Sequence, residues 1–234
     1  MTNFKPDTVL LKDPTIIEQV KEIENRESFL KRLEGKFTPE QIEAIDFAYD
    51  LAKESHRPQV RDSGERYFEH PRAGCLIMMD ELNMYDYNLI ISFLLHDTGE
   101  DTPIWGNVTE SYDQFVTKAK KRLSKVFNDR IADIVIKLTK PSVDNIKFFT
   151  KDEAFDFYIN QMQTDEDVLI GKMVDRLHNL RNLIGNRPEK IQKQIIETEE
   201  VYIPLFEKIT GKNKQYAEQL LEKIKDQLLA LKSL

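Results

Sequence analysis

The sequence predicts an all-α fold, a helical bundle of about ten helices in a single domain. The chain has only 8 glycines and 9 prolines in 234 residues. Strand-like alternation of apolar and polar residues is hard to find, whereas apolar residues recur at helical spacing along most of the chain. No repeat, low-complexity tract or linker marks a domain boundary. We therefore expect one domain over residues 14–234, preceded by a loose N-terminal arm over residues 1–13.

The first two helices are predicted from apolar spacing and from a capping signature. Residues 14–33 place isoleucine and valine side chains on one face. Residues 38–56 begin with Thr38 as the N-cap, Pro39 at the first helical position and Gln41 three residues after the cap. Further helices are predicted over residues 70–82, 87–97, 110–127, 129–138, 151–162, 165–184, 188–210 and 213–232. Irregular stretches are expected over residues 57–68, 98–109 and 139–150.

Composition limits the compartment and the partners of the protein. The formal net charge of −7 argues against nonspecific binding to long nucleic acid, although a local cluster of cations or a metal could still hold a small anion. The single cysteine, Cys75, excludes an intramolecular disulfide and favours a reducing compartment. The polar N-terminus does not resemble a signal peptide, and no apolar run approaches the length of a membrane span. We expect a soluble cytoplasmic protein; its oligomeric state is unknown.

The stretch FLLHDTGEDTP concentrates a histidine and three acids directly behind an apolar run. His96 and Glu100 are four residues apart, as are Asp97 and Asp101, so each pair would share a helix face. Two like charges about 4 Å apart cost on the order of 4 kcal/mol at an effective dielectric near 20. The cluster therefore favours a bound cation or a raised pKa on one acid. The alternative is that Glu100 and Asp101 merely point into water.

A second candidate group lies in the stretch LIGKMVDRLHNLRNL, where Asp175 stands among apolar residues of a predicted helix. Such an acid usually pairs with an arginine, and Arg176 or Arg181 could serve. A metal site would instead explain both stretches, because two imidazoles and two carboxylates are a reasonable ligand set for a divalent transition ion. A metal-activated water would then supply a nucleophile at neutral pH.

Four motifs together resemble one known family. RDSGERYFEHP, LLHDTGEDT, KMVDRLHNLRNL and ETEEVYIPLFEKITG are similar, in order and spacing, to the hydrolase domain of the RelA/SpoT alarmone enzymes, which belong to the HD phosphohydrolase superfamily. The resemblance covers about residues 37–211. It implies an HD-type helical bundle. Because 234 residues leave no room for the synthetase and regulatory domains of the long members, the chain resembles the small stand-alone alarmone hydrolases of the stringent response.

The resemblance implies a metal-dependent phosphohydrolase with one Mn²⁺ per chain. Its substrate would be a small nucleotide, ppGpp or pppGpp, whose 3′-pyrophosphate is hydrolysed to give GDP or GTP and pyrophosphate. Matched motif by motif, the metal ligands are His70, His96, Asp97 and Asp175, and the catalytic pair is Glu100 and Asp101. The substrate-binding residues are Arg61, Ser63, Asn179 and Tyr202. His56 and His178 match histidines that are not ligands.

One departure from the family pattern keeps other functions open. Asp62 stands where the family usually carries a basic residue beside Arg61. A related HD phosphohydrolase could act on another nucleotide, such as an adenosine alarmone or a dinucleotide phosphate. A third possible function is that of a catalytically silent alarmone-binding module. The presence of both Glu100 and Asp101 argues against it, because a pure binder has no evident need of two acids.

Overall fold

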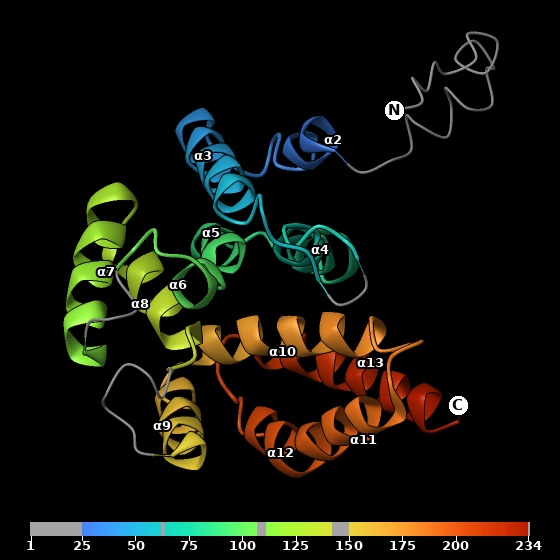
Figure 1. Cartoon of the computed structure of the whole chain (residues 1–234). Coiled ribbons are helices and arrows are strands. Elements are labelled where there is room, and N and C mark those ends of the chain that lie inside the picture. Colours follow the sequence, from blue (N-terminus) through green and yellow to red (C-terminus); the bar gives the residue numbers. More distant parts are fainter. Residues whose placement is uncertain (1–24, 62–63, 107–110, 142–149, 234) are drawn as a thin grey trace, which may run out of the picture. The chain divides into compact units, whose positions relative to one another are not determined.

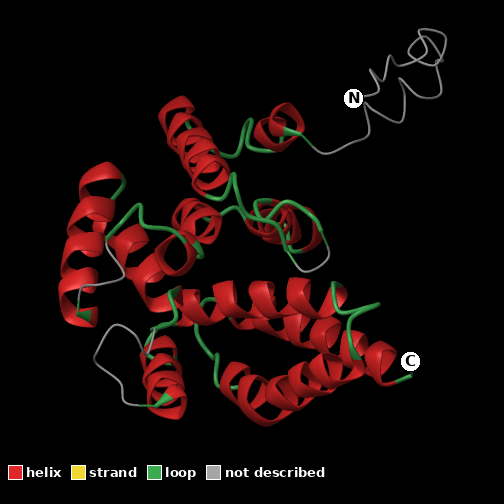
Figure 2. Ribbon diagram, viewed as in Figure 1, coloured by secondary structure: helices red, strands yellow, loops and turns green. Residues whose placement is uncertain are grey.

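The computed structural model describes residues 25–61, 64–106, 111–141 and 150–233 (Figures 1 and 2). Within these ranges every named element is a helix, which confirms the all-α prediction, and one isolated bridge joins Val60 to Arg66. The chain divides into two compact units, Met1–Ile42 and Glu43–Leu234. The N-terminal arm predicted over residues 1–13 lies outside the described residues. None of the described helices is long and apolar enough to cross a membrane.

The first unit contains α2 (Arg26–Lys31) and the start of α3 (Pro39–Ser55). Asn25 caps α2, since its side chain accepts a hydrogen bond from the Ser28 amide at 3.0 Å. The predicted capping box opens α3. The Thr38 amide donates to Gln41 Oε1 at 3.0 Å, and the Gln41 amide donates to Thr38 Oγ1 at 3.3 Å. The remainder of α3 belongs to the second unit.

The second unit carries all the other described elements. In chain order they are α4 (Glu69–Leu76), the π-helical turn η2 (Ile77–Glu81), α5 (Tyr87–Leu95), α6 (Thr98–Asp101), α7 (Tyr112–Val126), α8 (Asp129–Leu138), α9 (Lys151–Met162), α10 (Glu166–Arg181), α11 (Pro188–Glu197), the π-helical turn η4 (Thr198–Tyr202), α12 (Ile203–Phe206) and α13 (Lys214–Lys232). The bounds of α8 and α9 match the predicted ranges, and the other long helices differ by a few residues at their ends.

Two helices form the centre of this unit. Every residue of α5 from Leu89 to Leu95 is buried, and α10 buries most of its length. Helix α10 contacts α4, α5, α8, α9 and α13, and it runs beside α13 in Figure 1. Asp165 caps its N-terminus, and two acids in its first turn complement the helix dipole. A helix surrounded in this way can carry polar residues into the interior of the unit.

Three predicted stretches differ from the structure. The helix predicted over residues 14–33 does not run through Asn25, whose extended backbone begins α2, and residues 14–24 lie outside the described residues. Residues 98–109 were expected to be irregular but contain α6, whose turn is held by buried Thr98: its hydroxyl donates to the Leu95 carbonyl at 2.5 Å and accepts from Trp105 Nε1 at 2.7 Å. Four residues are too few to show a helical period. The single helix expected over residues 188–210 is α11, η4 and α12, because Pro204 has no amide hydrogen to continue a regular ladder.

Candidate metal centre and active site

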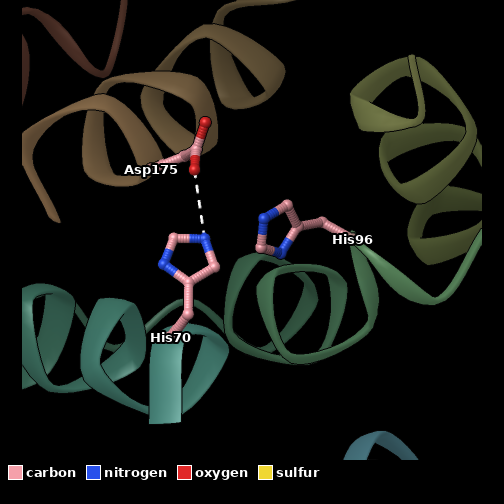
Figure 3. Close-up of side chains that lie close together, drawn as sticks. All are labelled: His70, His96 and Asp175. Atoms are coloured by element: carbon pink, nitrogen blue, oxygen red, sulfur yellow. Dashed lines mark ion pairs between the residues drawn. The ribbon is translucent and has the colours of Figure 1, made fainter. Parts of the chain in front are cut away.

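Three buried side chains from three helices meet in the second unit (Figure 3). His70 lies in the first turn of α4, His96 follows the last residue of α5, and Asp175 lies in α10. One candidate ligand atom of each lies within 4.8 Å of the others, and His70 Nε2 is 3.1 Å from Asp175 Oδ1. Asp97 adjoins the group, with Oδ1 3.1 Å from His96 Nε2 and Oδ2 3.7 Å from His70 Nε2. The fold therefore brings all four predicted ligands together.

The hydrogen bonding of His96 leaves one nitrogen free to bind a metal. His96 Nδ1 lies 2.8 Å from the Phe93 carbonyl oxygen, which can only accept, so Nδ1 carries the ring proton. In the neutral ring Nε2 then keeps its lone pair, and this atom is buried without a hydrogen-bond partner among the described residues. A lone pair facing the carboxylate of Asp97 is unfavourable without a cation. The residues present therefore fit a divalent metal ion.

A second histidine, His178, contacts the ring nitrogen of His70 that does not face Asp175. His70 Nδ1 lies 2.7 Å from His178 Nδ1, so one of the two nitrogens must donate to the other. Burial, with the nearby Arg61 guanidinium, lowers the pKa of His178 to about 3, and the ring is therefore neutral. When His70 donates to neutral His178, His70 Nε2 keeps its lone pair on the side of Asp175. A hydrogen bond from the ring nitrogen that does not bind the metal commonly fixes the orientation of a histidine ligand.

Asp175 is paired with a lysine, so the predicted arginine partner is wrong. Lys172, one turn earlier in α10, donates to Asp175 Oδ2 at 2.7 Å, and Asn179 Nδ2 donates to Oδ1 at 2.6 Å. Burial alone would raise the pKa of Asp175, but the Lys172 ammonium holds it well below its usual range. Arg176 and Arg181 instead bind glutamates elsewhere. The sequence spacing of Arg176 and Arg181 from Asp175 could not show that their partners are glutamates distant in sequence.

The two acids of α6 have different surroundings. Glu100 lines the pocket described below, and its Oε2 accepts from the Lys140 amide at 3.2 Å. Burial, with the charges of Asp97 and Asp101, raises the pKa of Glu100 to about 7, although solvent still reaches the side chain. Asp101 accepts from the Tyr67 hydroxyl at 2.5 Å and does not line the pocket. Both acids are exposed to solvent, and each also accepts a hydrogen bond from the protein.

The metal centre opens into a pocket of about 740 Å³, within the range of small-molecule sites. Its cationic lining among the described residues consists of Arg61, Lys140, Lys151, Lys172, Arg176, Lys190 and Lys193. Its acidic lining consists of Asp97, Glu100, Asp152, Asp175 and Glu197. Cations therefore exceed acids in this pocket although the whole chain has a formal net charge of −7. A divalent ion would increase this excess, so the pocket suits a polyanion.

Three of the predicted substrate-binding residues line this pocket. Arg61 Nη2 donates to Asn179 Oδ1 at 2.6 Å, so two of them contact each other. Tyr202 is buried at the pocket wall, and the Arg176 guanidinium lies over its ring at 4.0 Å. Ser63, the fourth, lies outside the described residues, as does Asp62. The sequence did not predict that Arg176 lines the pocket, because its contact with Tyr202 joins segments that are distant in sequence.

Comparisons with known proteins agree with this arrangement. The HD domain family model matches residues 48–209, more than half of the chain. The bifunctional (p)ppGpp synthase/hydrolase SpoT of Escherichia coli K12 is 34% identical over 185 residues, which are 77% of this chain and 24% of that protein. The guanosine-3′,5′-bis(diphosphate) 3′-pyrophosphohydrolase of Aquifex aeolicus is 36% identical over 173 residues, 73% of this chain and 22% of the relative. This chain thus spans about a quarter of the length of these curated relatives.

The fold also matches a solved structure. A metazoan ortholog of SpoT, described as hydrolysing ppGpp, superposes with a TM-score of 0.60 and 20% identity, covering 80% of this chain and 94% of the other. At this identity the likeness concerns the fold. Together with the family match over residues 48–209 and the His70–His96–Asp97–Asp175 cluster, it leads to one assignment: the chain belongs to the HD domain family.

Proposed function

We propose that this chain is a metal-dependent phosphohydrolase that removes the 3′-pyrophosphate of ppGpp and pppGpp, giving GDP or GTP and pyrophosphate. The observation that carries the proposal is a cluster of four potential ligands, three of them buried, that line a pocket rich in cations. Curated relatives named guanosine-3′,5′-bis(diphosphate) 3′-pyrophosphohydrolase match this part of the chain at 34–36% identity.

The chemistry divides among the residues of the pocket. A divalent ion at His70, His96, Asp97 and Asp175 would supply positive charge that activates water and polarises a phosphoryl oxygen. Lysine and arginine side chains of the wall hold the phosphates, and Arg61 can stack on a purine or bind phosphate through two nitrogens. Water attacks the phosphorus joined to the 3′ oxygen and the bond between them breaks. The proton lost by the water passes to the 3′ oxygen, which leaves as a hydroxyl. We infer that Glu100 accepts the water proton, and its pKa, raised to about 7, supports this role.

We infer that the resident ion is manganese and that the protein acts in the cytoplasm. Two imidazoles with two carboxylates suit a transition ion better than Mg²⁺, which prefers oxygen ligands. Cys75, the single cysteine, is buried and unpaired, which accords with a reducing compartment. Metal analysis of protein purified without added ions tests the first inference, with manganese as the expected metal.

A nucleotide panel tests the proposed function. We expect the manganese-loaded protein to release pyrophosphate from ppGpp and pppGpp, measured by chromatography, and to leave adenosine alarmones and dinucleotide phosphates intact. His96→Ala removes a nitrogen of the metal cluster, so it should abolish turnover and lower metal content. Lys120→Ala, which removes only an exposed ion pair with Asp133, is the matched control and should behave as the unmodified protein.

Two results of this panel would contradict the proposal. Turnover of another nucleotide in preference to ppGpp would assign the chain to a different HD phosphohydrolase. Tight binding of ppGpp without turnover would make it an alarmone-binding module.

A further inference from the structure

Asp101 is hydrogen-bonded to an aromatic side chain that lines the pocket. The Tyr67 hydroxyl donates to Asp101 Oδ2 at 2.5 Å, and Tyr67 lines the pocket whereas Asp101 does not. Burial, reinforced by the charges of Asp97 and Asp101, raises the pKa of Tyr67, so the phenol stays protonated. Its single proton is therefore directed at Asp101, and the lone pairs of its oxygen remain for a donor in the pocket.

Further contacts restrain the positions of Tyr67 and Asp101. Gln59 Nε2 donates to the Asp101 carbonyl at 2.7 Å, so the acid is restrained through its main chain as well as its carboxylate. Gln59 Oε1 in turn lies 2.6 Å from His56 Nδ1. The His56 ring stacks on Tyr67, with centroids 4.6 Å apart and planes 17° apart. Both partners of the Tyr67–Asp101 hydrogen bond are thus restrained by the linked pair His56 and Gln59.

We propose that Asp101 acts on the pocket through Tyr67: its carboxylate positions the Tyr67 hydroxyl, which is the group that contacts the substrate or the attacking water. Tyr67 becomes an additional polar contact of the reaction, and Asp101 becomes a positioning residue. Glu100 is left as the acid of α6 that faces the pocket directly. This inference rests on the proposed function, because it assigns roles within the same reaction.

Substitutions at Asp101 separate a positioning role from proton transfer. Asp101→Asn keeps an oxygen that can accept the Tyr67 hydroxyl, whereas Asp101→Ala removes it. We expect Asp101→Asn to retain kcat within about tenfold and Asp101→Ala to lose about 10- to 100-fold, the range set by one hydrogen bond to a charged group. A direct proton acceptor would instead lose about 10²–10⁴-fold in both variants.

A double-mutant cycle tests the link between the two residues. Tyr67→Phe should lower kcat about as much as Asp101→Ala, and the double variant should fall no further than the lower single variant. Tyr112→Phe is the matched control, because it removes a tyrosine hydroxyl 3.3 Å from Gln161 outside the pocket, and its kcat should not change. Metal content and melting temperature, measured on every variant, show whether the metal centre and the fold survive.

The outcomes distinguish this inference from the proposed function. Coupled losses at Tyr67 and Asp101, with metal content unchanged and Asp101→Asn active, support the inference. Additive losses, or normal turnover by Tyr67→Phe, would overturn it even if ppGpp is the substrate. If the unmodified protein hydrolyses no alarmone, the proposed function fails, and the cycle is then measured on the nucleotide that the panel identifies. If Asp101→Ala does not fold, the comparison of kcat between Asp101→Asn and Tyr67→Phe still tests the positioning role of Asp101.

Discussion

The surroundings of Glu100 oppose its charge. Burial and the carboxylates of Asp97 and Asp101 raise its pKa from 4.5 to about 7, against the lowering effect of Lys172 and the Lys140 amide. An acid with a raised pKa in the folded state costs stability once the pH exceeds the unfolded value, because the unfolded chain ionises first. The penalty grows between pH 4.5 and about 7 and is complete above that range.

Replacing Glu100 should therefore stabilise the metal-free protein in a pH-dependent way. We expect Glu100→Gln to raise the melting temperature at about pH 8, and the gain to shrink to nothing as the pH falls to about 4.5. Glu222→Gln, an exposed acid on α13, should show no such trend. A gain for Glu100→Gln that is equal at both pH values would mean that charge is not its cause. The same variant should hydrolyse ppGpp slowly, which separates stability from activity.

At this scale the sequence predicted which residues meet and missed how they are supported. His70, His96 and Asp175 could be grouped because each stands in a motif with characteristic spacing. Lys172 is three residues from Asp175 on the same helix and could have been found from that spacing. Tyr67 could not, because its contact with Asp101 spans 34 residues and depends on how α6 docks.

At the scale of elements, the metal centre depends on the close approach of α4 and α5. Gly74 faces Phe93, and a Cβ at this glycine would overlap the Phe93 ring. That ring stacks on His96 with centroids 4.5 Å apart, while His70 precedes Gly74 by one turn on α4. The glycine thus sets the separation of the two helices that carry the histidines.

Gly74→Ala should move the histidines apart. We expect overpacking to cost about 1–3 kcal/mol in the free energy of unfolding and metal affinity to fall by at least about tenfold, measured by urea denaturation and by metal titration. The double variant Gly74→Ala/Phe93→Leu makes room for the new methyl group and should recover part of the metal affinity. Recovery would identify the clash as the cause. Unchanged metal affinity in Gly74→Ala alone would show that α4 can shift without disturbing the site.

Element boundaries were predictable where local rules decide them. Asn128 caps α8 and Thr150 forms a capping box at α9, and the predicted bounds of both helices match the structure. The prediction failed where tertiary contacts decide. Helix α6 is a single turn held by Thr98 and Trp105, and η4 carries Tyr202 to the pocket through a π-helical turn that apolar spacing does not reveal.

On the scale of the second unit, the four potential ligands join elements that are separate in sequence. His70 comes from α4, His96 and Asp97 from the connection between α5 and α6, and Asp175 from α10. An ion bound by all four would bind the folded state and not the unfolded chain, so it adds stability by mass action. At a free metal concentration of 100 times Kd the gain is about 2.7 kcal/mol.

Metal removal should therefore lower the melting temperature of the whole second unit. We expect chelation of the purified protein to reduce the melting temperature by several degrees, and added Mn²⁺ to restore it with a concentration dependence that yields Kd. His96→Ala lacks the lone pair that is buried without a partner, so its melting temperature should not respond to Mn²⁺. Ca²⁺, which prefers oxygen ligands, should restore less than Mn²⁺ because two of the four ligands are imidazoles. An equal response of His96→Ala and the unmodified protein would place the stabilising ion elsewhere on the chain, and this result does not depend on which nucleotide is the substrate.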